Sequence, residues 1–370
     1  MHGVICRRHA RIMVTIPTEA ATHPTLMRAL LAGGMDIARI NCAHDDAETW
    51  LAMVGNLRSA MAEIGRPCRI HADLAGPKLR TGPTVDRELR VSQGERVLLT
   101  VTPEPGIPSG PGGPARISCT IPEVLARVRP GDPIWFDDGR VGGHVLSSSA
   151  TGIEVELDRV RPGGDRLKTG KGINLPQTDL GLAALTVEDR EALAVLAPHL
   201  DLVGLSFVRR AEDVAELDHA LAIAGRPELD RVLKIENGQA VRELPRILGT
   251  ALRGGRTGIM IARGDLAVEV GFGQLAEVQE DILSLCEAAH VPAIWATQVL
   301  ERIAKKGLPS RAELTDAAQG VRAECVMLNK GPYIVETLRF LAGILRRMDS
   351  HQTKRRPQTG RLSGSVARIG

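Results

Sequence analysis

Several features that would place a protein in a special class are absent from this 370-residue sequence. No segment has the roughly 18 consecutive apolar residues of a membrane-spanning helix, and the start, MHGVICRRHAR, lacks the apolar core of a signal peptide. The six cysteines include no CxxC pair, which argues against a zinc site and a disulfide framework. These absences predict a cytoplasmic protein that has no membrane partner.

The sequence also lacks a large excess of charge of either sign, and it has few aromatic side chains. The 47 basic and 44 acidic residues give a formal charge of only +3, and the chain has one Tyr, four Phe and three Trp. A nearly balanced charge does not favour a polyanion such as nucleic acid, and few aromatics are available to stack on bases. We therefore expect small-molecule partners and no nucleic acid.

What the sequence does have is a regular alternation of short β-branched runs with amphipathic segments, which is typical of a parallel sheet with crossover helices. Eight runs fit strands, and eight strands each followed by a helix indicate an α/β fold, a closed (β/α)₈ TIM barrel. The predicted strands are residues 11–16, 35–41, 69–74, 201–207, 231–236, 258–262, 293–297 and 324–329.

One gap is far longer than the others, between the third and fourth runs. It is too long for a loop, and residues 83–168 are rich in Val, Gly, Pro and turn signals, so we predict a small all-β domain inserted after strand 3, placed to act as a lid over the active-site face. The barrel then comprises residues 1–82 and 169–350, with helices at 186–196 and 334–348. Residues 351–370 form a polar tail that we expect to be disordered.

Acidic residues stand at the ends of two neighbouring predicted strands. Lys234 and Glu236 end the fifth run, and Asp265 follows the sixth. Mg²⁺ typically takes one or two protein carboxylates and fills its other positions with water and substrate oxygens. With a lysine on the same rim, the set suits chemistry on phosphate or on an enolate. The alternative for Lys234 and Glu236 is a surface salt bridge.

Polar residues also follow most of the other predicted strands. A single charged residue after a strand is usually a solvated loop residue, but polar groups at seven strand ends favour an active site on one rim. Besides those above, they are Arg39, Asn41, Asp73, Ser206, Thr297, Gln298, Asn329 and Lys330.

Eight short segments carry a resemblance that covers almost the whole barrel and the insertion. They are residues 35–41 (MDIARIN), 76–82 (GPKLRTG), 137–139 (DDG), 171–176 (KGINLP), 206–209 (SFVR), 234–237 (KIEN), 262–265 (ARGD) and 296–301 (ATQVLE). In this order they resemble the pyruvate kinase family. The resemblance implies phosphoryl transfer between phosphoenolpyruvate and ADP, giving pyruvate and ATP, with Mg²⁺, or Mn²⁺ in its place, held by Glu236 and Asp265.

The resemblance also implies roles for single residues. Lys234 would lie against the phosphoryl group and Arg39 would hold it from the opposite side, while Arg80 helps to bind phosphate. Thr297 would orient the enolate or the water that protonates it, and the alternative for Thr297 is a helix N-cap. The backbone of Gly264 and Asp265, at the start of a helix, would bind the substrate carboxylate.

Further matches concern the nucleotide and a monovalent cation. Lys171 and Asp138, on the side of the lid, match positions that approach the nucleotide phosphates, and Arg80 and Asn41 belong to the same nucleotide set. Asn41 and Asp73 also match the family's monovalent-cation neighbourhood.

That neighbourhood departs from the family in two places. Ala43 replaces a serine that usually supplies an oxygen ligand, and Lys78 replaces the glutamate of the family segment Gly-Pro-Glu-Ile-Arg. Because an ammonium group can take the place of K⁺, we predict turnover that does not require K⁺. The alternative is that Lys78 is an exposed charge without a role.

A larger departure follows the eighth predicted strand. The family commonly has Met-Leu-Ser-Gly-Glu-Thr-Ala-Lys-Gly, whereas this chain has Met-Leu-Asn-Lys-Gly at residues 327–331, so a carboxylate is missing beside the active site. Lys330 is either an added phosphate contact or a solvated loop residue.

The family's C-terminal domain, with its sugar-phosphate effector site, has no counterpart in the sequence, so we expect no activation by that route. Association of identical chains would then use the barrel helices.

Three functions stay open at this point. The first is a minimal pyruvate kinase. The second is a metal-dependent barrel enzyme that binds pyruvate or its enolate but catalyses another reaction, which the loop at Asn329 motivates. The third is a non-catalytic protein that binds phosphoenolpyruvate or a nucleotide.

Overall fold

A computed structural model describes residues 8–86 and 88–355 of the chain. These residues divide into two compact units. The first unit comprises the described parts of Met1–Ile40, Asp45–His71 and Pro292–Gly370, and the second comprises Asn41–His44 and Ala72–Val291.

Within the described residues, eight parallel strands form a closed barrel in the order β1-β16-β15-β14-β13-β12-β3-β2. They are β1 (Arg11–Thr15), β2 (Ile37–Asn41), β3 (Arg69–Asp73), β12 (Leu202–Leu205), β13 (Asp230–Ile235), β14 (Thr257–Ala262), β15 (Ala293–Ala296) and β16 (Cys325–Leu328). Each lies within, or one residue beyond, a run that the sequence predicts, so the predicted TIM barrel is confirmed.

The strands are short apolar runs because both of their faces are covered. Every residue of β13 and β14 is buried, which is the burial expected of strands in an all-parallel sheet. Polar side chains on these strands therefore need partners within the protein.

Helices follow the strands, and several begin at a side chain that caps the first turn. Asn237 caps α5 by accepting a hydrogen bond from the Ala240 amide, and Thr186 forms a capping box with Asp189 at the start of α3. The α-helices are α1 (Pro24–Gly33), α2 (Ala47–Ile64), α3 (Val187–Leu196), α4 (Ala211–Ile223), α5 (Gly238–Gly254), α6 (Arg263–Val270), α7 (Leu275–Ala288), α8 (Glu301–Lys306), α9 (Arg311–Gln319) and α10 (Ile334–Arg355).

The helix predicted for residues 186–196 is confirmed as α3, with Thr186 as its N-cap. The last predicted helix, 334–348, begins where expected but continues to Arg355 as α10. The predicted tail therefore starts inside this helix, and its remaining residues, 356–370, lie outside the described residues. None of the helices that the structure describes could span a membrane.

The insertion between β3 and α3, which we call the lid, consists mainly of β-strands, as predicted, but also contains one short 3-10 helix, η2 (Pro122–Arg127). A six-stranded sheet has the order β11-β7-β8-β9-β5-β6, and β4 and β10 form a separate two-stranded sheet. Its strands are β4 (Glu88–Val91), β5 (Arg96–Thr100), β6 (Ala115–Ser118), β7 (Pro133–Phe136), β8 (Val141–Ser149), β9 (Gly152–Arg159), β10 (Asp165–Lys168) and β11 (Ile173–Asn174).

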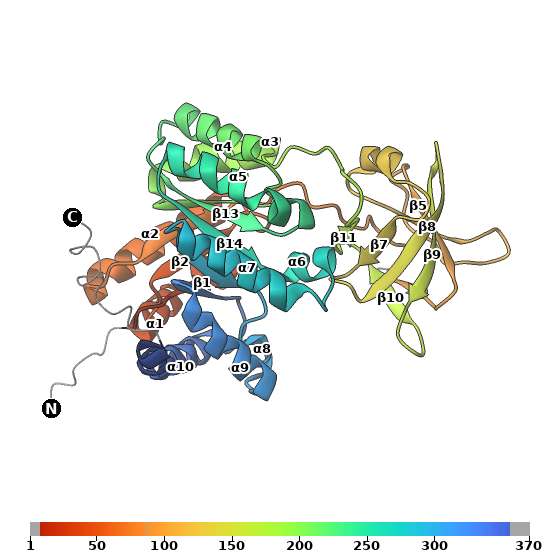
Figure 1. Ribbon diagram of the computed structural model, residues 1–370. Coiled ribbons are helices and arrows are strands. Elements are labelled where there is room, and N and C mark those ends of the chain that lie inside the picture. Colours follow the sequence, from red (N-terminus) through yellow and green to blue (C-terminus); the bar gives the residue numbers. More distant parts are fainter. Residues whose placement is uncertain (1–7, 87, 356–370) are drawn as a thin grey trace, which may run out of the picture. The chain divides into compact units, whose positions relative to one another are not determined.

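The core of the lid includes Leu79, Ile173 and Leu175, so it draws on residues beyond both ends of the predicted range 83–168. The strand β11 pairs with β7 and belongs to the larger sheet of the lid. It also lies against α6, as Figure 1 shows, and thus joins the lid to the strands and helices of the second unit.

Candidate active site

Lys234 and Glu236 are buried at the end of β13, with 9% and 4% of their surfaces exposed. Because side chains two residues apart on a strand point to the same side, Lys234 and Glu236 face one region. A surface salt bridge, the alternative drawn from the sequence, is therefore excluded. Burying a charged pair is costly unless partners compensate both groups.

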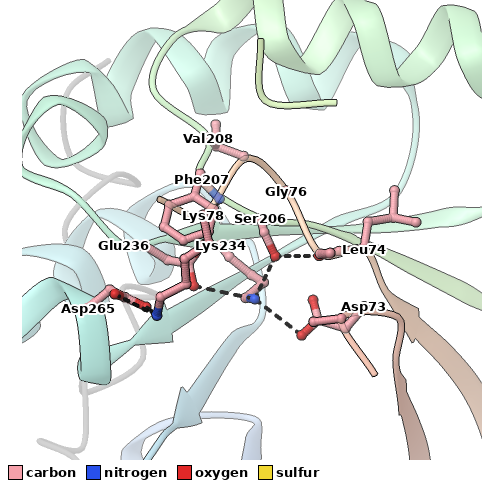
Figure 2. Close-up of polar contacts among 12 residues, drawn as sticks. Asp73, Leu74, Gly76, Lys78, Ser206, Phe207, Val208, Lys234, Glu236 and Asp265 are labelled. Carbon is pink, nitrogen blue, oxygen red and sulfur yellow. Dashed lines mark hydrogen bonds and ion pairs between the residues drawn. The ribbon is translucent and has the colours of Figure 1, made fainter. Parts of the chain in front are cut away.

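The ammonium group of Lys234 has three acceptors (Figure 2). Its Nζ donates to Ser206 Oγ at 2.7 Å, and lies 3.2 Å from Asp73 Oδ2 and 3.3 Å from Glu236 Oε1. Ser206 in turn donates to the Leu74 carbonyl at 2.5 Å. We call Asp73, Ser206, Lys234 and Glu236 the rim cluster. A lysine held by three acceptors is fixed in position before any substrate arrives.

Glu236 is bound from its other side by the backbone. The Phe207 amide donates to Glu236 Oε2 at 2.7 Å, and Phe207 has a φ of 54°, which is uncommon for a bulky residue. Burial raises the pKa of Glu236, and the charges of Asp265 and Asp73 add to this, while Lys234 and the Phe207 amide oppose it. A bound cation would stabilise the ionised form that burial disfavours.

Asp265 lies in the first turn of α6, as the sequence predicts, and Gly264 precedes it there. Lys78 Nζ donates to both carboxylate oxygens of Asp265, at 2.9 Å and 2.8 Å (Figure 2). The Lys78 side chain is only 20% exposed, so the alternative of a solvated charge is excluded. Lys78 thus pairs with Asp265, a contact that the sequence did not predict.

Two residues that were given no role in the sequence analysis complete this region. Asn174, on β11, donates to Asp265 Oδ1 at 3.3 Å and to Glu269 Oε1 at 3.0 Å. Burial raises the pKa of Glu269 to about 7, and the charge of Asp265 acts in the same direction. Glu269 follows Asp265 by one helical turn, a spacing that brings side chains together and that could have revealed it.

A cavity of about 360 Å³ opens beside these residues, large enough for a small substrate. Its lining includes Lys78, Asn174, Asp265, Glu269 and Arg209.

The lid residues predicted to approach a nucleotide are arranged around a sharp turn. Lys171 Nζ lies 2.9 Å from Asp137 Oδ1, whereas its neighbour Asp138, the predicted site residue, is exposed. Both aspartates have positive φ, 52° and 55°. Arg80 donates to the Gly170 carbonyl at 3.1 Å. The structure thus pairs Lys171 with the aspartate that the sequence analysis did not single out.

Asn41 lies near the backbone next to Asp73. Its side-chain carbonyl accepts a hydrogen bond from the Ala43 amide at 3.2 Å, and the Asp73 carbonyl accepts one from Cys42 at 2.9 Å.

The first unit holds the remaining predicted residues. Arg39 is 7% exposed and donates to Thr15 Oγ1 at 2.8 Å, and Thr15 donates to Asn329 Oδ1 at 3.4 Å. The hydroxyl of Thr15 thus links Arg39 to Asn329, in the loop that departs from the family after the last barrel strand. Lys330, next to Asn329, is exposed.

Thr297 is not a helix N-cap, because α8 begins at Glu301 with Leu300 in the cap position. Instead, Thr297 has a φ of 69° and Gln298 a φ of 58°. Positive φ at a β-branched residue is a genuine outlier, and such strain costs on the order of 1–3 kcal/mol and clusters at functional sites. The backbone conformation therefore marks Thr297 as a candidate functional residue. The alternative drawn from the sequence, a helix N-cap, is excluded.

The set of acids also allows a test for metal binding. Within residues 8–86 and 88–355, no three His, Cys, Asp or Glu side chains form a ready cluster for a metal ion. The four carboxylates of Asp73, Glu236, Asp265 and Glu269 nevertheless outnumber the three cations Lys78, Lys234 and Arg209 by one when all are ionised. Two carboxylates with an excess of negative charge fit a hard divalent ion that takes its other ligands from water and substrate.

Comparison with known proteins agrees with this geometry. The family model "Pyruvate kinase, barrel domain" matches residues 7–337. Pyruvate kinase 1 of Trypanosoma brucei brucei is 34% identical over 348 residues, which cover 91% of this chain and 66% of the relative. The pyruvate kinase of Agrobacterium vitis is 31% identical over 352 residues, 93% of this chain and 70% of the relative.

A third relative, the pyruvate kinase of Methylorubrum extorquens, is 35% identical over 325 residues, which cover 87% of this chain and 64% of the relative. The chain thus spans about two thirds of the length of these relatives. A family model that matches most of the chain, together with the barrel, the lid and the rim cluster, shows that this chain belongs to the pyruvate kinase family.

Proposed function

We propose that the protein catalyses transfer of a phosphoryl group between phosphoenolpyruvate and ADP, giving pyruvate and ATP. The observation that carries this proposal is the buried ammonium group of Lys234, held by Ser206, Asp73 and Glu236. Phosphoryl transfer needs positioning and stabilisation of charge more than covalent help from the protein. A fixed, buried cation meets both needs.

Each residue acts on one part of the substrate. Lys234 stabilises the oxygens of the phosphoryl group during transfer, and Arg39 holds the phosphate. The first turn of α6, with Gly264 and Asp265, offers backbone N–H groups to the substrate carboxylate. The Thr297 hydroxyl can give and accept a hydrogen bond and orients the enolate or the water that protonates it.

A divalent cation, Mg²⁺ or Mn²⁺, would be held by Glu236 and Asp265 and would neutralise charge on the phosphate oxygens. In the lid, Lys171 and Arg80 contact the nucleotide phosphates, and Asp138 and Asn41 complete the nucleotide set. The positive charge that Lys78 places on Asp265 supports turnover without K⁺, as does the loss of a hydroxyl ligand at Ala43.

The proposal also includes a cytoplasmic location and association of identical chains through barrel helices. A reducing compartment suits the described cysteines, which are free thiols at positions 42, 68, 119, 286 and 325. Light scattering of the purified chain tests the association, and cell fractionation tests the location.

The decisive experiment measures pyruvate formation from phosphoenolpyruvate and ADP with Mg²⁺, with and without K⁺, for the wild type and Lys234→Met. We expect turnover in both salts and a fall on the order of 10³-fold in the variant, because a charge that acts in the transition state is lost. Lys305→Met, which removes an exposed lysine on α8, is the control and should retain full activity.

Other results would separate the alternatives. Metal-dependent proton exchange at the methyl group of pyruvate, without ADP-dependent phosphoryl transfer, would favour an enolate enzyme of another reaction; the contact of Asn329 with Thr15 motivates this alternative. Calorimetric binding of phosphoenolpyruvate without any turnover would favour a binding protein. A requirement for K⁺ would refute only the role proposed for Lys78.

A further inference from the structure

The lid contains a basic cavity outside the candidate active site. It has a volume of about 430 Å³, and its described lining includes five basic side chains and one acid. We call it the lid cavity; its charged residues are Arg90, Arg140, Arg161, Asp165, Arg166 and Lys168. Such a volume suits a small ligand, and the excess of positive charge would attract an anion.

The cavity arises from the alternating pattern of β4 and β10, which pair antiparallel. Leu89 and Leu167 are buried on one face, and Arg90 and Arg166 point to the other. The register places Arg90 directly opposite Arg166. Like charges in this position are destabilising, so the sheet carries a repulsion that a bound anion would relieve.

Asp165, itself part of the lining, holds two of the arginines in place. Its side chain is 2% exposed and accepts hydrogen bonds from Arg161 Nε at 2.7 Å and Arg140 Nη2 at 3.0 Å. A buried carboxylate that binds two guanidinium groups fixes their orientation at the edge of the cavity. Arg140 and Arg161 are thus ordered by the protein itself.

The other basic side chains are less well compensated. Arg166 Nη1 lies 2.8 Å from Glu88 Oε1. Neither Arg90 nor Lys168 has an ion-pair partner among the residues that the structure describes. The two acids Asp165 and Glu88 therefore leave an excess of positive charge on the lining of the cavity.

We propose that the lid cavity binds a compact anion that carries a diphosphate group. Two guanidinium groups opposite each other can each bind a phosphate group through paired N–H donors, and Lys168 adds a point charge on the same face. This site would bind its ligand whether or not the protein is a pyruvate kinase.

Arg140 also donates to Asp137, the partner of Lys171. It is therefore left unchanged in the test, which uses Arg90→Gln/Arg166→Gln. The matched control is Arg96→Gln/Arg116→Gln, which removes the same charge from exposed positions on β5 and β6 of the lid.

The first measurement is calorimetric titration of the full-length chain with inorganic pyrophosphate, without divalent ions and at 0.15 M salt. We expect the wild type and the control to bind alike and Arg90→Gln/Arg166→Gln to lose the site or bind at least tenfold more weakly, since two charge-assisted contacts to the anion are removed. Equal binding by all three proteins would overturn the proposal. An equal loss in both double variants would do so too, since it would indicate attraction to net charge alone.

A second measurement does not depend on the variants. In amide NMR spectra of the wild type, pyrophosphate should shift the signals of Gly163 and Gly164, which line the cavity. ADP in place of pyrophosphate distinguishes a nucleotide from an inorganic ligand, because a nucleotide site would shift the same signals at lower concentration. Unchanged signals at both glycines with both ligands would refute the site.

Discussion

The rim cluster and the lid cavity both gather several charges, but they differ in exposure. In the rim cluster Lys234, Asp73 and Glu236 are buried and in contact. In the lid cavity the arginines Arg161 and Arg166 have side chains 63% and 51% exposed. A buried charge interacts strongly with its neighbours, whereas an exposed one is weakened by water and salt.

This contrast predicts that the same kind of substitution has effects of very different size in the two regions. Removing a buried partner leaves another buried charge uncompensated. Removing an exposed one changes little apart from long-range attraction.

The largest effect is expected from Glu236→Gln. This change keeps the shape of the side chain but removes a proposed metal ligand and a partner of Lys234, so pyruvate formation should fall on the order of 10³-fold. Because Lys234 stays buried and loses one of its partners, the melting temperature should fall as well. The control Glu277→Gln changes an exposed glutamate on α7. Full activity of Glu236→Gln would contradict the expectation that buried charges of the rim cluster matter more than the exposed charges of the lid cavity.

Glu269→Gln should change stability in a pH-dependent way. Burial raises the pKa of Glu269 from 4.5 to about 7, so between these values the folded protein holds a proton that the unfolded chain has released. Wild-type stability therefore falls as the pH rises through this window. With 1.36 kcal/mol per pKa unit, the variant should be more stable at pH 8 by at most roughly 3 kcal/mol, and less because Glu269 is only partly buried.

Urea unfolding at pH 4 and pH 8, without divalent ions, measures this difference. At pH 4 the Glu269 carboxyl of the wild type holds its proton in the folded and in the unfolded state. The greater stability of Glu269→Gln should therefore disappear at this pH. The same advantage at both pH values would show that the Glu269 carboxyl does not titrate as proposed. Glu277→Gln again serves as the control, because an exposed carboxyl should give no such change.

Lys78→Met should strengthen binding of a divalent ion. In the wild type the Lys78 ammonium binds both oxygens of Asp265, so it competes with a cation for that carboxylate. Without it, we expect the dissociation constant for Mn²⁺ to fall about tenfold, which corresponds to about 1.4 kcal/mol. Lys78→Arg retains the charge and is the matched control.

Electron paramagnetic resonance of free Mn²⁺ gives this constant without any assay of turnover. Weaker binding by Lys78→Met than by Lys78→Arg would mean that Lys78 helps to organise the site instead of competing for it. Pyruvate formation by the same variants, with and without K⁺, then tests the separate proposal that Lys78 replaces K⁺.

These residues show how far the sequence could lead. The barrel and its insertion were predictable because strand runs and their spacing are local signals. Lys234, Glu236 and Asp265 could be found because each lies at the end of a buried strand or at the start of the next helix. The carboxyl ends of barrel strands are where active sites occur, so their position along the chain made these residues candidates for the site.

Contacts between distant segments could not be predicted in the same way. Lys78 and Asp265 are 187 residues apart, and nothing in either segment indicates their pairing. Asp137 and Asp138 are adjacent in sequence, and only the backbone turn decides which of them faces Lys171. The helix boundary at Leu300 depends on a backbone turn that follows from tertiary structure, so the sequence alone could not exclude the alternative of a helix N-cap at Thr297.

The smallest effect is expected from Arg90→Gln in the lid cavity. Arg90 lies opposite Arg166 across β4 and β10, so removing one charge should stabilise the lid by roughly 0.2–1 kcal/mol. Because Arg166 is exposed, the gain should shrink in about 1 M salt, where the screening length is only about 3 Å. Urea unfolding at low and high salt measures both values, with Arg96→Gln, which removes an exposed charge paired with Glu154, as the control. A gain that persists in high salt would mean that the repulsion is not screened, and that the lid cavity resembles the rim cluster more closely than its exposure implies.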